Sequence, residues 1–566
     1  MSLEQTADNS LKKDQNAAVS RREFLKLASA SGLASATSGF AFASSAVGSK
    51  ADDGTPEQIH ITWGKDPTSE VSISWSSPGR SVNPRVKIKG AEEETRTVHA
   101  AQRIYTDGLN DEIAYSYHAR VHGLNPGRAY TYEITADNDR NLNRPFSSSF
   151  QTAPRDLQPF RWTSFGDLAT PNPVWTLSYP QARFAVMAVE RFQPLFHLLN
   201  GDLSYANLSS LSQPEVWRDF ANNVQISAAN RPWMPCPANH EIEFYNGPQG
   251  IDSYLSRYSL PDNGTSFPGH WYSFRAGSVF FISLDGSDVA YQDSGPAVSG
   301  PNPLSPAPAT GNAPIPPGTS FYVRGYSRGE QTRWLERTLR KASEEEGVDW
   351  IVVQTHYGAL SSTKTGNGSD KGAREEWLPL FDKYGVDLVL CGHDHDYERS
   401  YPVRGANHDA GTDAATGAVV DTLQPRPIIP ADPAATRFDT RQGTVHLILG
   451  GGGTSAPLDV YGEDSANGKV QAKVFTKRNE WIAGTTPGTF TRKPADALED
   501  AIWSAQRDTS TGYGIGVFDY EPCRADGKTT ITFRYYHAVG ADKTPTGDYE
   551  LFETIVFEKE KKERGT

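Results

Sequence analysis

The chain has 566 residues, of which 37% are apolar, 11% aromatic and 22% charged, so its length suits two or three domains with cores of their own. This composition excludes a mainly disordered protein, and its 50 Gly and 38 Pro exclude a coiled-coil or collagen-like one. The net charge of -13 repels a phosphate backbone, so no nucleic-acid duplex is expected as a partner. Three cysteines cannot build a disulfide framework.

The N-terminal segment 1–46 has the features of an export signal. Residues 20–26 read Ser-Arg-Arg-Glu-Phe-Leu-Lys and precede a weakly apolar stretch, 27–47, that is rich in Ala, Ser and Gly. This pattern predicts a twin-arginine signal peptide, cleaved after Ala43 or Ala46, and delivery of the folded chain to the periplasm or the medium by the twin-arginine export machinery. No other segment approaches the roughly 20 apolar residues of a spanning helix, so no membrane span is expected after signal removal.

Residues 55–153 show the period-two pattern of β-strands. The apolar residues that alternate with polar ones are Val71, Ile73, Trp75, Val86, Ile88, Tyr117, Ala119, Val121, Tyr130, Tyr132 and Ile134. The segment is similar to a fibronectin type III or other immunoglobulin-like sandwich, and its 124–132 run, Leu-Asn-Pro-Gly-Arg-Ala-Tyr-Thr-Tyr, resembles the tyrosine corner of that fold. We predict a non-catalytic all-β domain here.

After Pro154 apolar strands alternate with helical stretches, which predicts an α/β domain over residues 156–560. The expected strands are 160–165, 195–199, 279–284, 350–354, 386–390 and 445–449. The expected helices are 181–196, 214–224, 329–346 and 375–384, the first of which overlaps a strand by two residues. Three stretches rich in Pro, Gly or Asp, 286–325, 405–442 and 462–510, are expected to be surface loops or excursions.

Polar side chains suited to metal binding follow these strands directly. They lie in five segments: Gly166-Asp167, Asn200-Gly201-Asp202-Leu203-Ser204-Tyr205, Asn239-His240-Glu241, Thr355-His356 and Gly392-His393-Asp394-His395. Because the carboxyl ends of strands form the ligand crevice of an open α/β sheet, we expect these segments to converge on one site.

The residue types indicate what such a site would hold. Two Asp, one Asn, one Tyr and three His offer oxygen and nitrogen donors without a thiolate, which suits iron, manganese or zinc. Seven donors are too many for one four-coordinate zinc ion but enough for two metals that share a carboxylate. Two metals about 3.5–4 Å apart can clamp a phosphoryl group and acidify a bound water. The sequence therefore predicts hydrolysis of a small phosphoester.

In order and spacing, the five segments resemble the metallophosphoesterases, and within them the purple acid phosphatases. That family has an Asp, then Gly-Asp-x-x-Tyr, Asn-His-Glu or Asn-His-Asp, a single His, and Gly-His-x-His. The Tyr-Glu-Arg-Ser run at 397–400 is also like the family. The resemblance implies an α/β (α+β) fold with four layers, a β-sandwich flanked by helices, preceded by the all-β sandwich. Tyr205 is the residue that marks the purple acid type.

The resemblance also implies a role for each position. Asp167, Tyr205 and His395 would bind Fe(III), Asn239, His356 and His393 would bind a divalent Fe, Zn or Mn ion, and Asp202 would bridge the two. His240 would contact the phosphate or protonate the leaving alkoxide, with a hydrogen bond to a metal ligand as the alternative. The implied activity is that of an exported acid phosphatase that hydrolyses phosphomonoesters by attack of a metal-bound hydroxide.

The sequence departs from the family at two places. Ala238 replaces the Gly that usually precedes the Asn-His pair, and residues 358–371 lack a substrate-contacting His that plant-type members often carry. Lys364, Lys371 or Arg374 could supply positive charge to the phosphate instead, the alternative being solvated loop residues. The glycine run 450–453 is interpreted as a flexible turn rather than a phosphate loop, and Cys391 as a buried residue rather than a ligand.

Other functions remain as alternatives. A phosphodiesterase or nucleotidase could use the same scaffold, and so could an exported alkaline phosphatase of the iron and calcium type, against which Tyr205 argues. A different class is an adhesion or binding protein with a vestigial metal site. All seven ligand positions are filled, which argues against loss of activity.

Overall fold

The structure, a computed structural model, describes residues 52–155, 157–175, 180–209, 212–243, 246–292, 324–413, 415–432, 434–454, 461, 469–483, 490–522, 526–538 and 547–561. The predicted signal peptide and most of the 286–325 excursion lie outside the described residues. Among the described helices, none combines the length and apolarity needed to cross a membrane.

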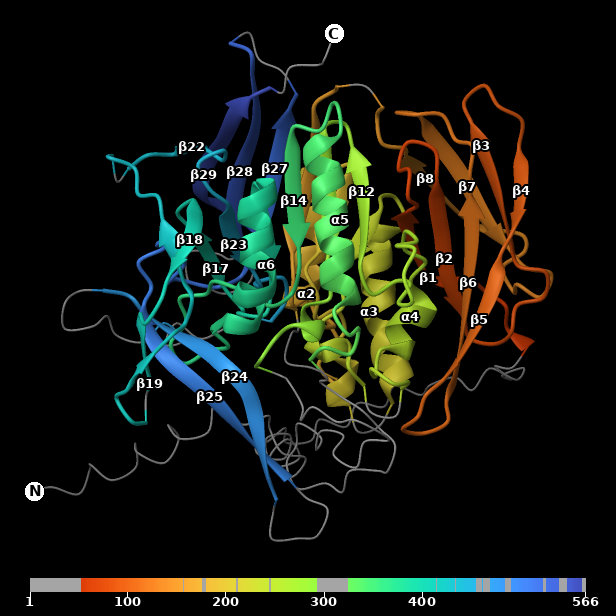
Figure 1. Cartoon of the computed structure of the whole chain (residues 1–566). Helices are drawn as coiled ribbons and strands as arrows, with labels where there is room; N and C mark the ends of the chain where they lie inside the picture. The colour runs from red at the N-terminus through yellow and green to blue at the C-terminus, as the bar shows by residue number, and fades with distance from the viewer. Residues whose placement is uncertain are drawn as a thin grey trace, which may run out of the picture.

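The N-terminal part is a sandwich of two antiparallel four-stranded sheets, seen in red and orange in Figure 1. One sheet has the order β1-β2-β6-β5, from Glu57–Trp63, Val71–Ser77, Ile113–Val121 and Ala101–Thr106. The other has the order β4-β3-β7-β8, from Arg96–His99, Arg85–Gly90, Ala129–Thr135 and Phe146–Gln151. The backbone N–H of Asn125 donates to the hydroxyl of Tyr130 at 2.8 Å, which is the hydrogen bond expected of a tyrosine corner.

Two seven-stranded sheets follow. The first has the order β11-β10-β9-β27-β28-β29-β22, from Trp233–Pro235, Phe196–Leu199, Phe160–Phe165, Gly514–Glu521, Lys528–Ala538, Tyr549–Glu560 and Arg437–Asp439. The second has the order β12-β13-β14-β16-β23-β17-β26, from Tyr272–Ala276, Val279–Ser283, Trp350–Gln354, Leu388–Cys391, Val445–Leu449, Tyr397–Ser400 and Ser504–Arg507. Strands β9, β10 and β11 are parallel, as are β13, β14, β16 and β23.

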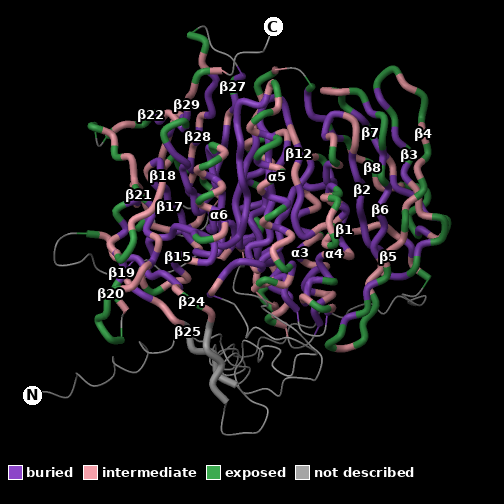
Figure 2. Tube along the Cα trace, viewed as in Figure 1, coloured by how far each residue is buried: buried purple, intermediate pink, exposed green. Residues whose placement is uncertain are grey.

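The two sheets pack face to face and helices cover their outer faces. Trp162, Phe281 and Phe518 belong to the core between the sheets. Helices α2 (Gln181–Phe192) and α3 (Gln213–Ala228) pack on the first sheet, and α5 (Glu330–Glu344) and α6 (Lys371–Tyr384) pack on the second. Figure 2 shows the buried interior that results. The predicted four-layer fold is confirmed, and a short helix α4 (Asp252–Arg257) lies beside β5.

Some predicted elements were wrong at their ends. The helix expected over 181–196 ends at Phe192 because Gln193 adopts a left-handed conformation, with a φ of 47°, and Pro194 follows it. The helix expected from 375 begins at Lys371, because the carboxylate of Asp370 caps it by accepting from the backbone N–H groups of Gly372 and Ala373.

Two stretches predicted as surface loops or excursions contain strands. A five-stranded sheet has the order β15-β24-β25-β19-β20, from Ser369–Asp370, Gln471–Ala483, Phe490–Asp500, Gly411–Asp413 and Val419–Val420. A separate two-stranded antiparallel sheet pairs β18 (Val403–Asn407) with β21 (Gln424–Pro427). Several of these strands are very short and β24 and β25 are rich in charged residues, so they lack the apolar alternation by which strands are predicted.

Candidate metal centre

The five predicted segments meet where the two large sheets end side by side. They follow the carboxyl ends of β9, β10 and β11 in one sheet and of β14 and β16 in the other. The side-chain amide of Gln354, the last residue of β14, donates to the backbone carbonyls of Leu199 and Met234 in the opposite sheet, at 2.7 and 3.2 Å. This contact holds the two sets of strand ends, and the segments that follow them, close together.

One half of the centre is a buried cluster around Asp202. Nε2 of His356 lies 3.1 Å from Oδ2 of Asp202 and 3.1 Å from Nδ1 of His393. Candidate ligand atoms of these three residues all lie within 4.8 Å of one another. Oδ1 of Asn239 is buried without a hydrogen-bond partner. A buried amide oxygen normally has a partner, so this orphaned acceptor indicates a place for a cation.

The other half is built on Asp167. The hydroxyl of Tyr205 lies 3.2 Å from Oδ1 of Asp167 and 3.1 Å from Nε2 of His395, and that nitrogen is 3.3 Å from the same carboxylate oxygen. Thr454 supports this half, since its hydroxyl and its backbone N–H both donate to the backbone carbonyl of Asp167 at 2.9 Å. A carboxylate, a phenol and an imidazole therefore point at one another.

The hydrogen bond on the far side of His356 shows why the half around Asp202 needs a cation. Nδ1 of His356 donates to the backbone carbonyl of Asn200 at 2.7 Å, and because a carbonyl only accepts, the lone pair of a neutral ring is on Nε2, facing Asp202. Burial lowers the pKa of His356, but the carboxylates of Asp202 and Asp167 outweigh it and raise the pKa to about 10. In the metal-free protein a proton therefore occupies the place that a metal ion fits.

The phenol of Tyr205 leads to the same conclusion for the second half. Burial, together with the carboxylates of Asp167 and Asp202, raises the pKa of Tyr205 well above its ordinary value. Burial also raises the pKa of Asp167, although His356 and His395 oppose it. A strong positive charge is needed before these groups can act as anions together, and a bound metal ion supplies it.

Two other residues, Glu241 and Asn207, position the site through hydrogen bonds. Glu241 accepts from the backbone N–H groups of Leu203 and Asp202 with its two carboxylate oxygens, at 2.8 and 3.0 Å. Oδ1 of Asn207 accepts from Nδ1 of His240 at 2.8 Å. The Asn-His-Glu motif signalled Glu241, whereas Asn207 carried no pattern that would have identified it.

Arg374, one of the cations predicted as candidates to face the phosphate, is a structural residue. Its side chain is fully buried and forms a bidentate ion pair with Glu499, at 2.7 and 3.0 Å. The same guanidinium donates to the backbone carbonyls of Ala359 and Thr422. Nζ of Lys371 lies 3.6 Å from Oε1 of Glu375, one turn along α6. Arg374 therefore joins α6 to β25.

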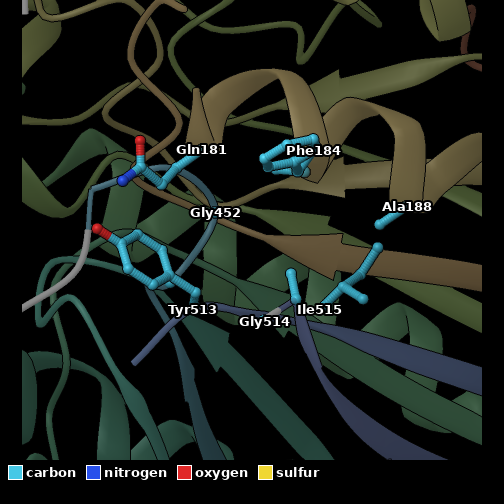
Figure 3. A pocket seen from close by; sticks show the side chains of 10 residues that line it. Gln181, Phe184, Ala188, Gly452, Tyr513, Gly514 and Ile515 are labelled. Carbon is cyan, nitrogen blue, oxygen red and sulfur yellow. The ribbon is translucent and has the colours of Figure 1, made fainter. Parts of the chain in front are cut away.

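The glycine run 450–453 is a tightly packed backbone crossing, so its interpretation as a flexible turn was wrong. A Cβ added at Gly451 or Gly453 would lie 1.7 or 1.8 Å from the backbone oxygen of Gly512 or Leu168. The N–H groups of Gly450 and Gly452 donate to the carbonyls of Asp396 and Gly166. Figure 3 shows the small pocket beside this run, where Phe184, Ala188 and Ile515 lie near Gly452, and none of the proposed metal ligands lines it.

Comparison with known proteins places the chain in a family. Residues 56–153 match the family described as Purple acid Phosphatase, N-terminal domain, and residues 166–397 match the family described as Calcineurin-like phosphoesterase. An uncharacterized protein of Mycobacterium tuberculosis strain H37Rv is 38% identical over 495 residues, covering 85% of this chain and 84% of its own. The chain belongs to the purple acid phosphatase family.

Other purple acid phosphatases match at lower identity. The protein named Fe(3+)-Zn(2+) purple acid phosphatase 12 of Arabidopsis thaliana is 26% identical over 355 residues, covering 61% of this chain and 65% of its own. The solved purple acid phosphatase from yellow lupin seeds is 17% identical, with a TM-score of 0.58, covering 89% of this chain and 75% of its own, which shows a shared fold. As a member of this family the chain is a metallophosphoesterase, a phosphoric monoester hydrolase with a dinuclear metal centre.

Proposed function

We propose that this chain is an exported acid phosphatase whose centre holds Fe(III) and a divalent Fe, Zn or Mn ion. The observation that carries the metal assignment is the contact of Tyr205 with both Asp167 and His395, because a phenolate ligand suits a trivalent ion. The twin-arginine pattern at residues 20–26 supports export, and one relative is named for an Fe(3+)-Zn(2+) pair.

The side chains divide into two sets of ligands. Asp167, Tyr205 and His395 would hold the ferric ion, Asn239, His356 and His393 would hold the divalent ion, and Asp202 would bridge them. When bound, such a pair supplies Lewis-acid stabilisation of the phosphoryl oxygens and lowers the pKa of a water molecule.

In this proposal His240 acts on the substrate. Its side chain is 22% exposed, whereas that of Asp202 is 2% exposed, so His240 lies toward the open side of the centre. Nδ1 donates to Asn207, and Nε2 lies 3.9 Å from Oδ2 of Asp202. The ring also packs on Tyr205 with 4.1 Å between centroids. Nε2 of a protonated ring would give its proton to the leaving oxygen of a small phosphomonoester.

The test is hydrolysis of an aryl phosphate by the mature protein after removal of metals with a chelator. Activity is expected to disappear and to return when iron and zinc are restored, with no such return in Asp202→Asn, because the bridging carboxylate is lost. Asp66→Asn is the matched control: Asp66 accepts from Thr68 and Ser69 in a turn of the sandwich. Full turnover in Asp202→Asn would show that this centre is not the active site.

A further inference from the structure

His393 is held on both sides of its imidazole ring. Nδ1 lies 3.1 Å from Nε2 of His356, inside the metal centre, and Nε2 lies 2.8 Å from Oε1 of Gln292 on the opposite side. His393 and Gln292 are both buried. A neutral imidazole has one N–H and one lone pair, and only the form with hydrogen on Nε2 presents its lone pair to the centre.

A closed ring of hydrogen bonds decides which nitrogen carries the hydrogen. The backbone carbonyl of His393 accepts from Nδ2 of Asn367, and a carbonyl cannot donate, so the amide of Asn367 has one orientation. Its Oδ1 then accepts from Nε2 of Gln292 at 2.9 Å. Oε1 of Gln292 is left to accept, and the donor it faces is Nε2 of His393. The backbone carbonyl of His393 thus fixes, through Asn367 and Gln292, which nitrogen of its own ring carries the hydrogen.

Two carboxylates fix the backbone of the residues that form this ring of hydrogen bonds. Oδ1 of Asp394 accepts from the backbone N–H of Asn367 at 2.8 Å. Oδ2 of Asp370 accepts from the backbone N–H groups of Tyr291 and Gln292 at 2.8 and 2.9 Å, while its other oxygen caps α6. Both amide side chains therefore extend from anchored backbone.

We propose that Gln292 and Asn367 are positioning residues that hold His393 as its Nε2–H tautomer, with the lone pair of Nδ1 directed at the divalent ion. The inference about the tautomer stands on the hydrogen bonds alone, and its consequence for metal binding rests on the proposed function. Outer hydrogen bonds of this kind orient ligand histidines, and their loss lowers metal affinity about 10–100-fold.

The experiment uses the full mature chain in two forms. In the metal-free protein, ¹⁵N NMR of labelled histidine identifies which nitrogen of His393 is protonated. Zinc affinity is then measured by competition with a chelator for the wild type, Gln292→Leu and Gln292→Glu. Leucine removes the acceptor for Nε2 of His393, whereas glutamate keeps that acceptor and loses only the N–H that donates to Asn367. Gln331→Leu is the matched control, since Gln331 is a buried amide that holds residues 285–288 and does not contact His393.

We expect hydrogen on Nε2 of His393 in the wild type, an affinity about 10–100-fold lower in Gln292→Leu, and affinity preserved in Gln292→Glu and Gln331→Leu. Hydrogen on Nδ1, or unchanged zinc affinity in Gln292→Leu, would overturn the proposal. An equal loss in Gln331→Leu would also overturn it, because general loosening would then explain the effect. If all these results hold and the loaded protein hydrolyses no phosphoester, the proposed function fails and the tautomer assignment stands.

Discussion

Four of the seven proposed ligands have backbone conformations that cost free energy. Asp167, Asp202, Tyr205 and His393 have φ values of 61°, 52°, 60° and 76°, in the left-handed region that non-glycine residues seldom adopt. Each such residue costs on the order of 1 kcal/mol, and the surrounding structure must hold it in place. The hydrogen bonds around these residues therefore keep them in a conformation that the chain would otherwise leave.

Glu241 is the clearest of these supports. We expect Glu241→Gln to lower the free energy of unfolding of the metal-free protein by about 1–3 kcal/mol, because an amide can accept from only one of the two backbone N–H groups that Glu241 now satisfies. Turnover should fall with it, since Asp202 loses an anchor. Urea denaturation and an aryl phosphate assay measure the two effects.

Glu336→Gln is the control for this change, because Glu336 lies on α5 with an exposed Lys383 as its partner. It should leave the stability almost unchanged, because exposed ion pairs contribute little. Equal stability of Glu241→Gln and the wild type would show that Glu241 does not support the site.

At the scale of single residues, the sequence alone pointed to the side chains that we propose as ligands, because they lie in short motifs after apolar runs. It did not predict Asn207, Gln292, Asn367 or Thr454 as supports. These residues act through partners far away in the chain, as Thr454 does on Asp167, so no local spacing reveals them.

At the scale of elements, strands that are buried along all or most of their length were the most predictable. Strands β9, β14 and β23 have the predicted ends, since a short apolar run bounded by polar residues defines each. No strand was predicted over β27, β28 and β29, although Ile531, Phe533 and Tyr535 alternate as a signal. Strand β27 pairs with β9, more than 300 residues earlier in the chain, and no local pattern indicates such a partner.

The glycine run gives a prediction at this scale. Gly453→Ala should lower the free energy of unfolding by about 2 kcal/mol or more, because the added Cβ meets the backbone oxygen of Leu168 and forces the segment next to Asp167 to shift. Gly417→Ala is the control, since Gly417 has a φ of 70° with no heavy atom within 4 Å of the added Cβ. It should cost only about 1 kcal/mol of backbone strain. Similar losses for both would show that close packing is not the reason for the run.

At the scale of the whole molecule, a net charge of -13 faces an anionic substrate, so positive charge must be concentrated locally. The buried proton of His356 in the metal-free protein is one such charge, and metal ions would replace it. The metal-free and metal-loaded forms should therefore differ in how stability depends on pH.

We predict that the metal-free protein loses stability as the pH rises from about 7 to 9. The pKa of His356 is about 10 in the folded chain and about 6.5 in the unfolded chain, so in this range His356 binds one proton more in the native state and by itself lowers stability by about 1.4 kcal/mol per pH unit. The buried His118 and His446, whose pKa burial lowers to about 3, oppose this only below about pH 7, where unfolded imidazole is charged.

Urea denaturation at several pH values measures this slope, and His356→Asn should flatten it by about one proton. A metal-free wild type whose stability rises between pH 7 and 9, or the same slope in His356→Asn, would contradict the assignment of a buried charged imidazole.

The central claim is that Asp167, Tyr205 and His395 hold a ferric ion beside a divalent one. The visible absorption spectrum of the mature protein loaded with iron and zinc tests it most directly. A tyrosinate on Fe(III) should give a charge-transfer band in the visible, and Tyr205→Phe should lose the band. A colourless protein that holds two metal ions, or a band that survives in Tyr205→Phe, would contradict the claim.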